Sequence, residues 1–239
     1  MKYTLTRRRF LQRAGSAAVF SSLGPRARLV ASERAGREPL VLWYDRAASR
    51  WTEALPVGNG RLGAMVFGGV ERERLQLNED TLFAGGPYDP NNPDAFAALG
   101  EARRLIFAGE YTKANDLVGE KMMAQPIKQM PYEPVGDLLL DFPGHVEASD
   151  FRRELDLDTA IARSTYRVDG VSFEREVFAS PVDQVVVVRL TSDRPGRLTF
   201  RASLTTPQNG TVDAISPDTL VLKGRNGEAS GIKGALTFQ

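Results

Sequence analysis

The sequence predicts a mainly β protein, an antiparallel β-sandwich with a short two-helix insertion near residues 94–123. Short apolar runs, separated by turn residues, fill most of the chain after Leu40. After Val135 these runs follow one another with almost no room for helices between them. A parallel sheet needs a long crossover, usually helical, between its strands, so this close spacing favours an antiparallel sandwich.

The first pair of strands is expected on either side of two glycines. Arg61 to Phe67 and Glu73 to Asn78 have strand-like patterns and are joined at Gly68-Gly69, which predicts two adjacent strands. Asn59-Gly60 precedes them. Both of these residues tolerate a positive φ, so a tight turn is expected there.

Two helices are expected in the middle of the chain. Asp94 is suited to be an N-cap, and apolar residues from Phe96 to Phe107 recur near helical spacing. Gly109 can end this helix, and a second one is expected from Tyr111 to Met123. Three prolines between positions 126 and 134 prevent its continuation and predict a loop.

From Val135 onward the chain is expected to consist of strands. Asp169-Gly170 joins two alternating runs and predicts a hairpin with a tight turn. The expected strands are 138–142, 151–157, 161–168, 171–178, 185–190, 198–204, 220–222 and 232–238.

The last expected strand has apolar residues on one face and ends one residue before the chain does. An unpaired apolar strand invites aggregation, so this pattern predicts a domain truncated at its C-terminal end. The expected organisation is therefore a signal peptide over residues 1–31, a polar linker over residues 32–39 and a sandwich domain over residues 40–239.

The N-terminus predicts export. Arg7 and Arg8 stand shortly before Phe10 and Leu11, and a weakly apolar stretch rich in small residues follows. This order is typical of a twin-arginine signal peptide and predicts a periplasmic or extracellular location. The apolar stretch is too short and too polar for a stable membrane anchor, which needs about 20 apolar residues. A basic, disordered tail is the alternative.

The charge of the sequence argues against nucleic acid as a partner. The chain has 31 basic and 30 acidic residues, and residues 1–31 hold seven of the basic residues and no acid. The remaining domain is therefore mildly acidic. Nucleic-acid binding needs clustered Lys and Arg for the phosphates, and this domain has only short basic runs broken by acids.

No cofactor or metal is expected. The sequence has no cysteine and a single histidine, His145. Zinc, haem and iron–sulfur sites depend on these two residue types, so such sites are nearly excluded. Because His145 follows Pro143-Gly144, it is expected on an exposed turn without a catalytic role.

Two long motifs point to a known family. One runs from Leu42 to Gly69 and contains WTEALPVGNGRLGAMVFGG, and the other runs from Leu75 to Pro87 as LQLNEDTLFAGGP. Together they resemble the N-terminal domain of glycoside hydrolase family 95, the α-L-fucosidase family. Ala47 stands where the family usually has Pro, and Phe83 stands where it usually has Trp, which removes an indole N–H donor.

The resemblance implies a larger enzyme. Family members pair an N-terminal β-sandwich with an (α/α)6 barrel in the same chain, and the barrel carries the catalytic acid and base for inverting hydrolysis of a fucosylated glycan. Nothing in residues 1–239 has the long run of paired amphipathic helices that such a barrel needs. No catalytic residue is therefore assigned, and the chain alone is expected to be inactive.

The expected role of the sandwich is to brace the missing barrel and to line the rim of its active site. The candidate rim residues are Asn59, Arg61, Glu79, Asp80 and Phe83. Glu53, Glu79, Asp80 and Asp89 could by composition supply a carboxyl pair. The alternatives are that Glu79 and Asp80 stabilise turns or form salt bridges, or that they orient their loop against the barrel. The second functional hypothesis is a stand-alone carbohydrate-binding or interaction module without catalysis.

Overall fold

The computed structural model describes residues 40–239 of the chain. The expected signal peptide over residues 1–31, with its four signal residues, and the expected linker over residues 32–39 lie outside this range. Among the described residues, no helix combines the length and the apolar character needed to cross a membrane.

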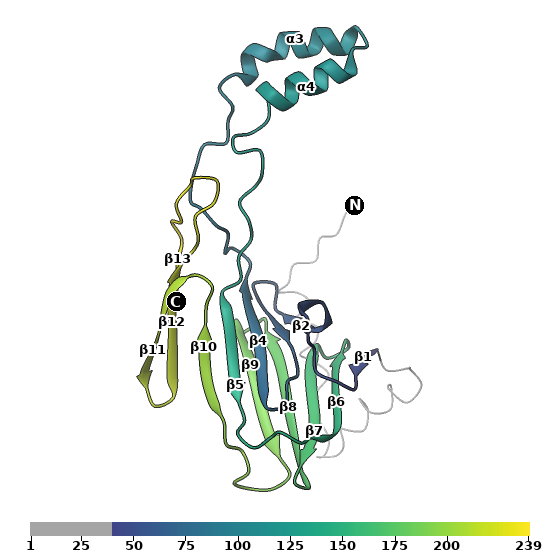
Figure 1. The fold of residues 1–239 in the computed structure, drawn as a ribbon, viewed down its shortest axis with the longest axis vertical. Helices are drawn as coiled ribbons and strands as arrows, with labels where there is room; N and C mark the ends of the chain where they lie inside the picture. Colours follow the sequence, from purple (N-terminus) through teal and green to yellow (C-terminus); the bar gives the residue numbers. More distant parts are fainter. Residues whose placement is uncertain (1–39) are drawn as a thin grey trace, which may run out of the picture. The chain divides into compact units, whose positions relative to one another are not determined.

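Two five-stranded antiparallel sheets form the body of the domain (Figure 1). The first has the order β1-β6-β7-β8-β9 and the second has the order β10-β5-β4-β3-β2. The first sheet contains β1 (Val41–Tyr44), β6 (Ser149–Asp156), β7 (Ile161–Val168), β8 (Val171–Ser180) and β9 (Val185–Ser192). The second contains β2 (Leu55–Gly58), β3 (Leu62–Val66), β4 (Arg72–Glu79), β5 (Gly136–Asp141) and β10 (Arg201–Thr205).

A third, smaller sheet follows at the C-terminal end of the sequence. Its order is β11-β12-β13. Its strands are β11 (Asn209–Ser216), β12 (Thr219–Arg225) and β13 (Thr237–Phe238). A short 3-10 helix, η1 (Trp51–Glu53), connects β1 to β2.

The two five-stranded sheets share one apolar core. Leu75 of β4 is completely buried and belongs to one cluster with Leu155 of β6 and Val177 of β8. Alternate residues of a strand point to opposite faces, so such a cluster forms where the inward faces of two sheets meet. The predicted antiparallel sandwich is therefore confirmed. The other buried members are Leu55, Val57, Ala64, Val66 and Ala162.

The predicted tight turns form where residues adopt a positive φ. At the end of β7, Asp169 and Gly170 have φ values of 51° and 72°. Two successive positive φ values are those of a type I′ turn, and they bring Val168 opposite Val171. Gly60 also has a positive φ, 93°, in the turn between β2 and β3. The hairpin expected at Asp169-Gly170 and the turn expected at Asn59-Gly60 are both confirmed.

The predicted two-helix insertion is also confirmed, between β4 and β5. α3 spans Ala95–Phe107 and α4 spans Tyr111–Lys121. Gly109, with φ 76°, lies just beyond α3. The expected capping role of Asp94 is wrong, because its backbone is already helical and its side chain makes no cap hydrogen bond. The side-chain oxygen of Asn92 instead accepts the backbone N–H of Asp94 at 3.0 Å.

The strand expected over residues 232–238 forms only at its end, as β13. The residues before it run as a loop beside Asn226, whose Oδ1 accepts the Leu236 N–H at 2.9 Å. A Cβ on Gly234 would lie 2.0 Å from the Asn226 carbonyl oxygen. This segment therefore packs against a neighbouring loop, and the apolar alternation that suggested a longer strand is misleading.

His145 is buried rather than exposed, which corrects the expectation from its position after Pro143-Gly144. It is only 7% exposed, and its Nδ1 lies 3.0 Å from the Tyr166 hydroxyl. Its ring packs against Phe173, with 4.4 Å between ring centroids. Burial lowers the pKa of His145, and the nearby Arg175 acts in the same direction. The histidine is thus part of an aromatic cluster in the interior.

Candidate functional site

The candidate rim residues gather at the end of the second sheet where β2, β3 and β4 meet. Asn59 and Arg61 belong to the turn between β2 and β3, and Glu79 is the last residue of β4. β3 and β4 remain paired up to this end, which makes the turn and the end of β4 neighbours. Asp80 and Phe83 follow where the chain leaves the sheet towards α3.

Glu79 is held by three donors. Its Oε1 lies 3.1 Å from Arg61 Nε. Its Oε2 accepts the backbone N–H of Thr81 at 2.8 Å and the hydroxyl of the same residue at 2.6 Å. The Thr81 hydroxyl and then its N–H and Arg61 lower the pKa of Glu79. The carboxylate therefore stays ionised near neutral pH and is unsuited to be a general acid.

Asn59 connects the two sheets of the sandwich. Its Nδ2 donates to the carbonyl oxygen of Ser180, at the end of β8, at 2.9 Å. Its Oδ1 accepts the backbone N–H groups of Arg61 at 3.1 Å and of Leu62 at 2.8 Å. One amide thus shapes the turn that presents Arg61 and ties it to the opposite sheet.

The remaining two rim residues differ in how they are fixed. The backbone N–H of Asp80 donates to the Arg61 carbonyl oxygen at 3.0 Å, while the residue itself is exposed. Phe83 meets Tyr132 edge-on, with ring centroids 4.9 Å apart. The Tyr132 hydroxyl donates to the Glu79 carbonyl oxygen at 2.8 Å. All five candidates therefore lie in one contact network, and Tyr132 is the member that sequence reasoning missed.

Tyr132 carries a weak sequence signal, since it lies in a proline-rich loop 53 residues after Glu79. The sequence separation between Tyr132 and Glu79 depends on the length of the helical insertion between them, and no local sequence pattern specifies that length. Burial raises the pKa of Tyr132, so its hydroxyl keeps its proton and its donor role at neutral pH.

A cavity of about 720 Å³ opens beside the ion pair. Arg61, Glu79 and Thr81 are polar residues in its lining. The apolar lining comes from the second and third sheets and from the segments next to them. It includes Leu77, Leu82, Val135, Leu204, Leu222 and Phe238. Two of the five rim residues, Arg61 and Glu79, therefore border open space of the size that small ligands occupy.

The other carboxylates considered for catalysis are engaged in their own loops. Glu53 accepts the backbone N–H of Ser49 at 3.0 Å and pairs with Arg50 at 2.8 Å. The Ser49 N–H, followed by Arg50, lowers the pKa of Glu53 to about 2. Asp89 accepts the Asn91 N–H at 2.9 Å. These contacts favour the interpretation that Glu53 and Asp89 stabilise loops through hydrogen bonds and, for Glu53, an ion pair.

One acid has a raised pKa but no access to a ligand. Glu73 is 2% exposed, and its Oε2 lies 3.5 Å from Nη1 of the equally buried Arg175. Burial raises the pKa of Glu73 to about 7, against the lowering effect of Arg175 and of two backbone N–H groups. A raised pKa often marks a catalytic acid. Here Glu73 of β4 pairs with Arg175 of β8 and so links the two sheets inside the core. We therefore assign this carboxyl group a structural role.

Within residues 40–239, no group of three or more His, Asp and Glu side chains is arranged to hold a metal ion. The site is thus built from one ion pair, one amide, one exposed carboxylate and two aromatic rings. Such a set can position a polar ligand or a neighbouring loop. It offers no arrangement with an acid and a base poised for proton transfer.

Comparison with known proteins identifies the family of the domain that carries these residues. The family model described as "Glycosyl hydrolase family 65, N-terminal domain" matches residues 42–239. The chain belongs to this family. N-terminal domains of this family also occur in the fucosidases of glycoside hydrolase family 95, so the resemblance found in the two motifs is confirmed.

The similar proteins are α-fucosidases and are much longer than this chain. Alpha-L-fucosidase 2 from Arabidopsis thaliana is 44% identical over 169 residues, which cover 69% of this chain and 20% of that protein. Probable alpha-fucosidase A from Aspergillus niger is 35% identical over 162 residues, or 64% of this chain and 20% of that protein. Its namesake from Aspergillus oryzae is 32% identical over 160 residues, or 63% of this chain and 21% of that protein.

The chain is therefore homologous to the N-terminal regions of α-fucosidases and spans about one fifth of the length of these relatives. The relatives have further domains beyond the region that they share with this chain.

The role of Asn59 in this family domain is testable. In Asn59→Ala the turn loses two hydrogen bonds and the link to Ser180, so the free energy of unfolding should fall by about 1–3 kcal/mol. Urea unfolding followed by circular dichroism measures the change. Asn115→Ala, at an exposed position of α4, is the matched control and should stay within about 0.5 kcal/mol of the parent chain. Equal stabilities of the two variants would show that the amide does not hold the turn.

Proposed function

We propose that this chain is the N-terminal domain of an exported α-L-fucosidase-like glycoside hydrolase. In this role the sandwich braces a helical catalytic domain and lines the rim of its inverting active site with Asn59, Arg61, Glu79, Asp80 and Phe83. The observation that carries the proposal is the match to α-fucosidases about five times as long as the matched region.

The chemistry of the rim supports a positioning role. Inverting hydrolysis requires an acid and a base about 6.5–9.5 Å apart, with the acid protonated at working pH. The pKa of Glu79 is lowered by Thr81 and Arg61, and both carboxylate oxygens already accept hydrogen bonds. Arg61 and the exposed Asp80 can instead contact a glycan hydroxyl or a loop of the neighbouring domain.

The full chain should therefore not hydrolyse an aryl α-L-fucoside above the rate in buffer. The assay is release of the aryl group by purified chain at pH 5 to 8, with a complete α-L-fucosidase as positive control. Turnover that disappears in Glu79→Gln or Asp80→Asn would contradict the non-catalytic role and would assign the chemistry to this chain.

A stand-alone carbohydrate-binding module is the second candidate function. The 720 Å³ cavity beside Arg61 and Glu79 is the observation that favours it. Binding of a fucosylated oligosaccharide by the isolated chain, lost in Arg61→Ala, would support this alternative. A rim that is completed only by the catalytic domain should bind such a glycan too weakly to detect.

Export by the twin-arginine route is the proposed path to the periplasm or beyond. The receptor of this route reads paired guanidinium groups, which lysine does not replace. Changing both Arg7 and Arg8 to Lys should therefore retain the protein in the cytoplasm of a bacterial host. Fractionation and immunoblotting measure this. An unchanged periplasmic yield would remove the signal assignment.

A further inference from the structure

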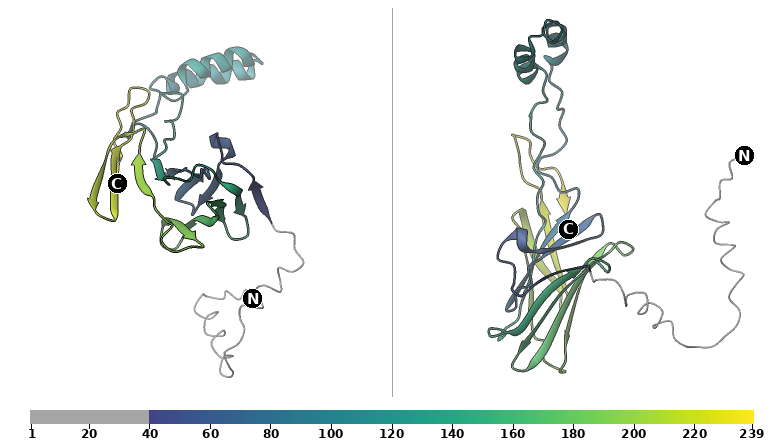
Figure 2. Two further views of the ribbon diagram at one scale, coloured as in Figure 1. Left: turned by 60° about the horizontal axis from the view of Figure 1, so that its bottom comes forward. Right: turned by 90° about the vertical axis from the view of Figure 1, so that its right-hand side faces the viewer.

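The helices α3 and α4, here called the helix pair (residues 95–121), lie away from the sheets. Figures 1 and 2 show them beyond the end of the sandwich, at the tip of the insertion between β4 and β5. Their buried side chains are Ala102, Leu105 and Ala114. Isolated helices of 11 to 13 residues are marginal in water. Three small or medium side chains give the helix pair little core of its own.

The connection to the sandwich is nevertheless well organised. It consists of residues 80–94 and 122–135, here called the stalk. The two segments of the stalk run side by side, and their backbones are hydrogen-bonded to each other. The bonds are Glu133 N–H to Leu82 O at 2.9 Å, Ala84 N–H to Pro131 O at 2.9 Å and Gln125 N–H to Pro90 O at 3.0 Å.

The base of the stalk is anchored to the loop before β13. Gly85 N–H donates to the Gly227 carbonyl oxygen at 2.7 Å, and Asn226 Nδ2 donates to the Phe83 carbonyl oxygen at 2.7 Å. The stalk thus begins among the rim residues and holds the helix pair at a defined place rather than on a loose loop.

α3 presents an apolar stripe to solvent. Phe96 and Phe107 are 89% and 88% exposed. They are separated by three helical turns, so they lie on one face about 16 Å apart along the axis. Tyr111, 69% exposed, follows at the start of α4. Arg103 is also exposed on this face, between the two phenylalanines. Two largely exposed phenylalanine rings on one helix face are typical of a docking surface.

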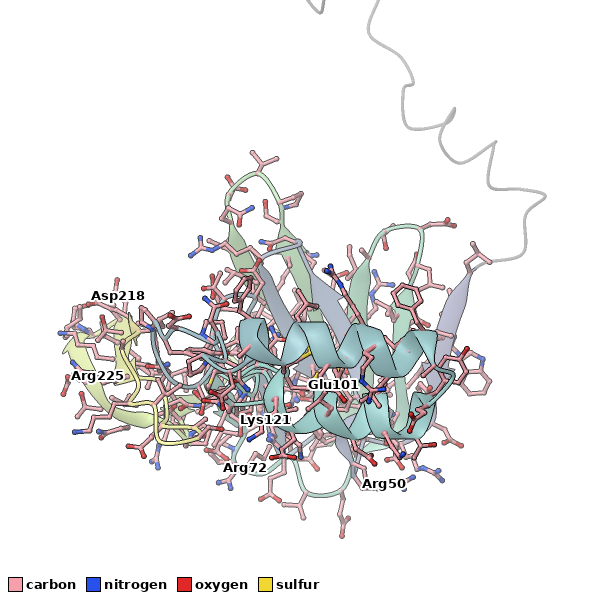
Figure 3. The ribbon with its side chains drawn as sticks, turned by 90° about the horizontal axis from the view of Figure 1, so that it is seen from above. Arg50, Arg72, Glu101, Lys121, Asp218 and Arg225 are labelled. Atoms are coloured by element: carbon pink, nitrogen blue, oxygen red, sulfur yellow. The ribbon has the colours of Figure 1, made fainter. Side chains whose placement is uncertain are left out.

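The charge of the helix pair argues against a membrane or a nucleic acid as the partner. It has four acidic and four basic residues, whereas anionic lipids and phosphates attract an excess of Lys and Arg. Figure 3 shows Glu101 of α3 and Lys121 of α4, one of each sign, on this part of the molecule.

The size of the stripe argues against a second copy of the chain. Each aromatic side chain buries about 150–250 Å². Even with Tyr111 added to Phe96 and Phe107, the three rings fall short of the roughly 800 Å² per partner of a stable interface between separate chains. A domain on the same polypeptide needs less contact area, because the linker supplies an effective concentration in the millimolar range.

We propose that the helix pair is a docking arm whose Phe96–Phe107 stripe packs onto the domain that follows in the longer relatives. This inference rests on the proposed function, since it takes that domain as the occupant. The stalk then places the helix pair against the partner domain, while the rim residues at its base face the active site.

The isolated full chain gives the first test. Without its partner, the helix pair should exchange amide hydrogens at least about 100-fold faster than the core strands β7 and β8. Hydrogen exchange read by mass spectrometry measures both regions in one sample. Protection of the helix pair equal to that of the core strands would overturn the proposal. So would a dimer that Phe96→Ser and Phe107→Ser together dissociate.

A chimera gives the second test. Leu40–Gln239 replaces the matching segment of alpha-L-fucosidase 2, and the helix pair should then gain at least about tenfold protection. The double variant Phe96→Ser and Phe107→Ser should lose that protection. Val182→Ser, which changes an equally exposed residue between β8 and β9, is the matched control and should retain it.

The two proposals can fail separately. A chimera whose helix pair is protected but which has no activity would count against the rim function and would leave the docking arm in place. An active chimera in which the double variant behaves like Val182→Ser would overturn the docking arm alone.

Discussion

Replacing Arg175 by Met should lower the free energy of unfolding by about 3–5 kcal/mol, the usual effect of removing one partner of a buried ion pair. Arg175 is 3% exposed and pairs with Glu73, and it also donates to the Val70 carbonyl oxygen at 2.6 Å and to the Tyr166 hydroxyl. Methionine fills much of the volume but leaves the carboxyl and the carbonyl groups without their donor. Urea unfolding of parent and variant at pH 7 measures the difference.

The double variant Glu73→Gln with Arg175→Met is the control for this prediction. Because it removes the buried charge together with its partner, it should recover part of the loss. A single variant that loses less than about 1 kcal/mol would show that the network does not hold the sheets together.

The pKa of Glu73 determines how the free energy of unfolding changes with pH. Burial raises the folded-state pKa of Glu73 from 4.5 to about 7, so the folded state holds this proton more tightly than the unfolded state does. The stability that protonated Glu73 contributes is fully present below pH 4.5, and it is lost as the pH rises towards and through 7. In Arg175→Met the loss of stability should accordingly be larger at pH 8 than at pH 6.

Local signals predicted most of the sandwich. The Asp169-Gly170 turn forms because two residues that tolerate positive φ separate two alternating strands, and both helices follow their apolar spacing. Strand β11 was missed because its residues, Asn209–Ser216, are all exposed and carry no apolar alternation. The last expected strand was too long because contacts with Asn226 hold residues 232–236 as a loop.

Burial of polar residues could not be predicted. Arg153 and Arg175 belong to a residue type that is seldom buried, and neighbouring charged residues suggest an outward direction for them. Both lie, however, on the inner face of their strands, each two residues from a buried apolar residue, Leu155 or Val177. Arg153 is nevertheless 1% exposed and donates to the carbonyl oxygens of Arg46 at 2.6 Å and Glu53 at 2.8 Å. These acceptors lie about one hundred residues away in sequence, so only the assembled sandwich brings them together.

The candidate site was predicted in part. Turn signals and the family resemblance placed Asn59, Arg61 and Glu79 near one another. The ion pair between the last two depends on the register of β3 and β4. Tyr132 and Asn226 join the network across 53 and 143 residues, distances over which no local pattern extends.

The largest effect on activity is expected when this domain is removed from a complete enzyme. Alpha-L-fucosidase 2 without the segment that matches this chain should lose at least about 100-fold in kcat/KM, because the rim and the brace are absent. Replacing that segment by Leu40–Gln239 should restore most of the activity, since 44% identity preserves the sandwich. Thermal unfolding of each protein checks that the catalytic part is folded.

Activity of the intact, deleted and chimeric enzymes on an aryl α-L-fucoside is therefore the most direct measurement. If the domain braces and lines the active site, the intact enzyme should have high activity and the folded deletion almost none. The chimera should recover the activity. A folded deletion that hydrolyses the fucoside as fast as the intact enzyme would contradict this role.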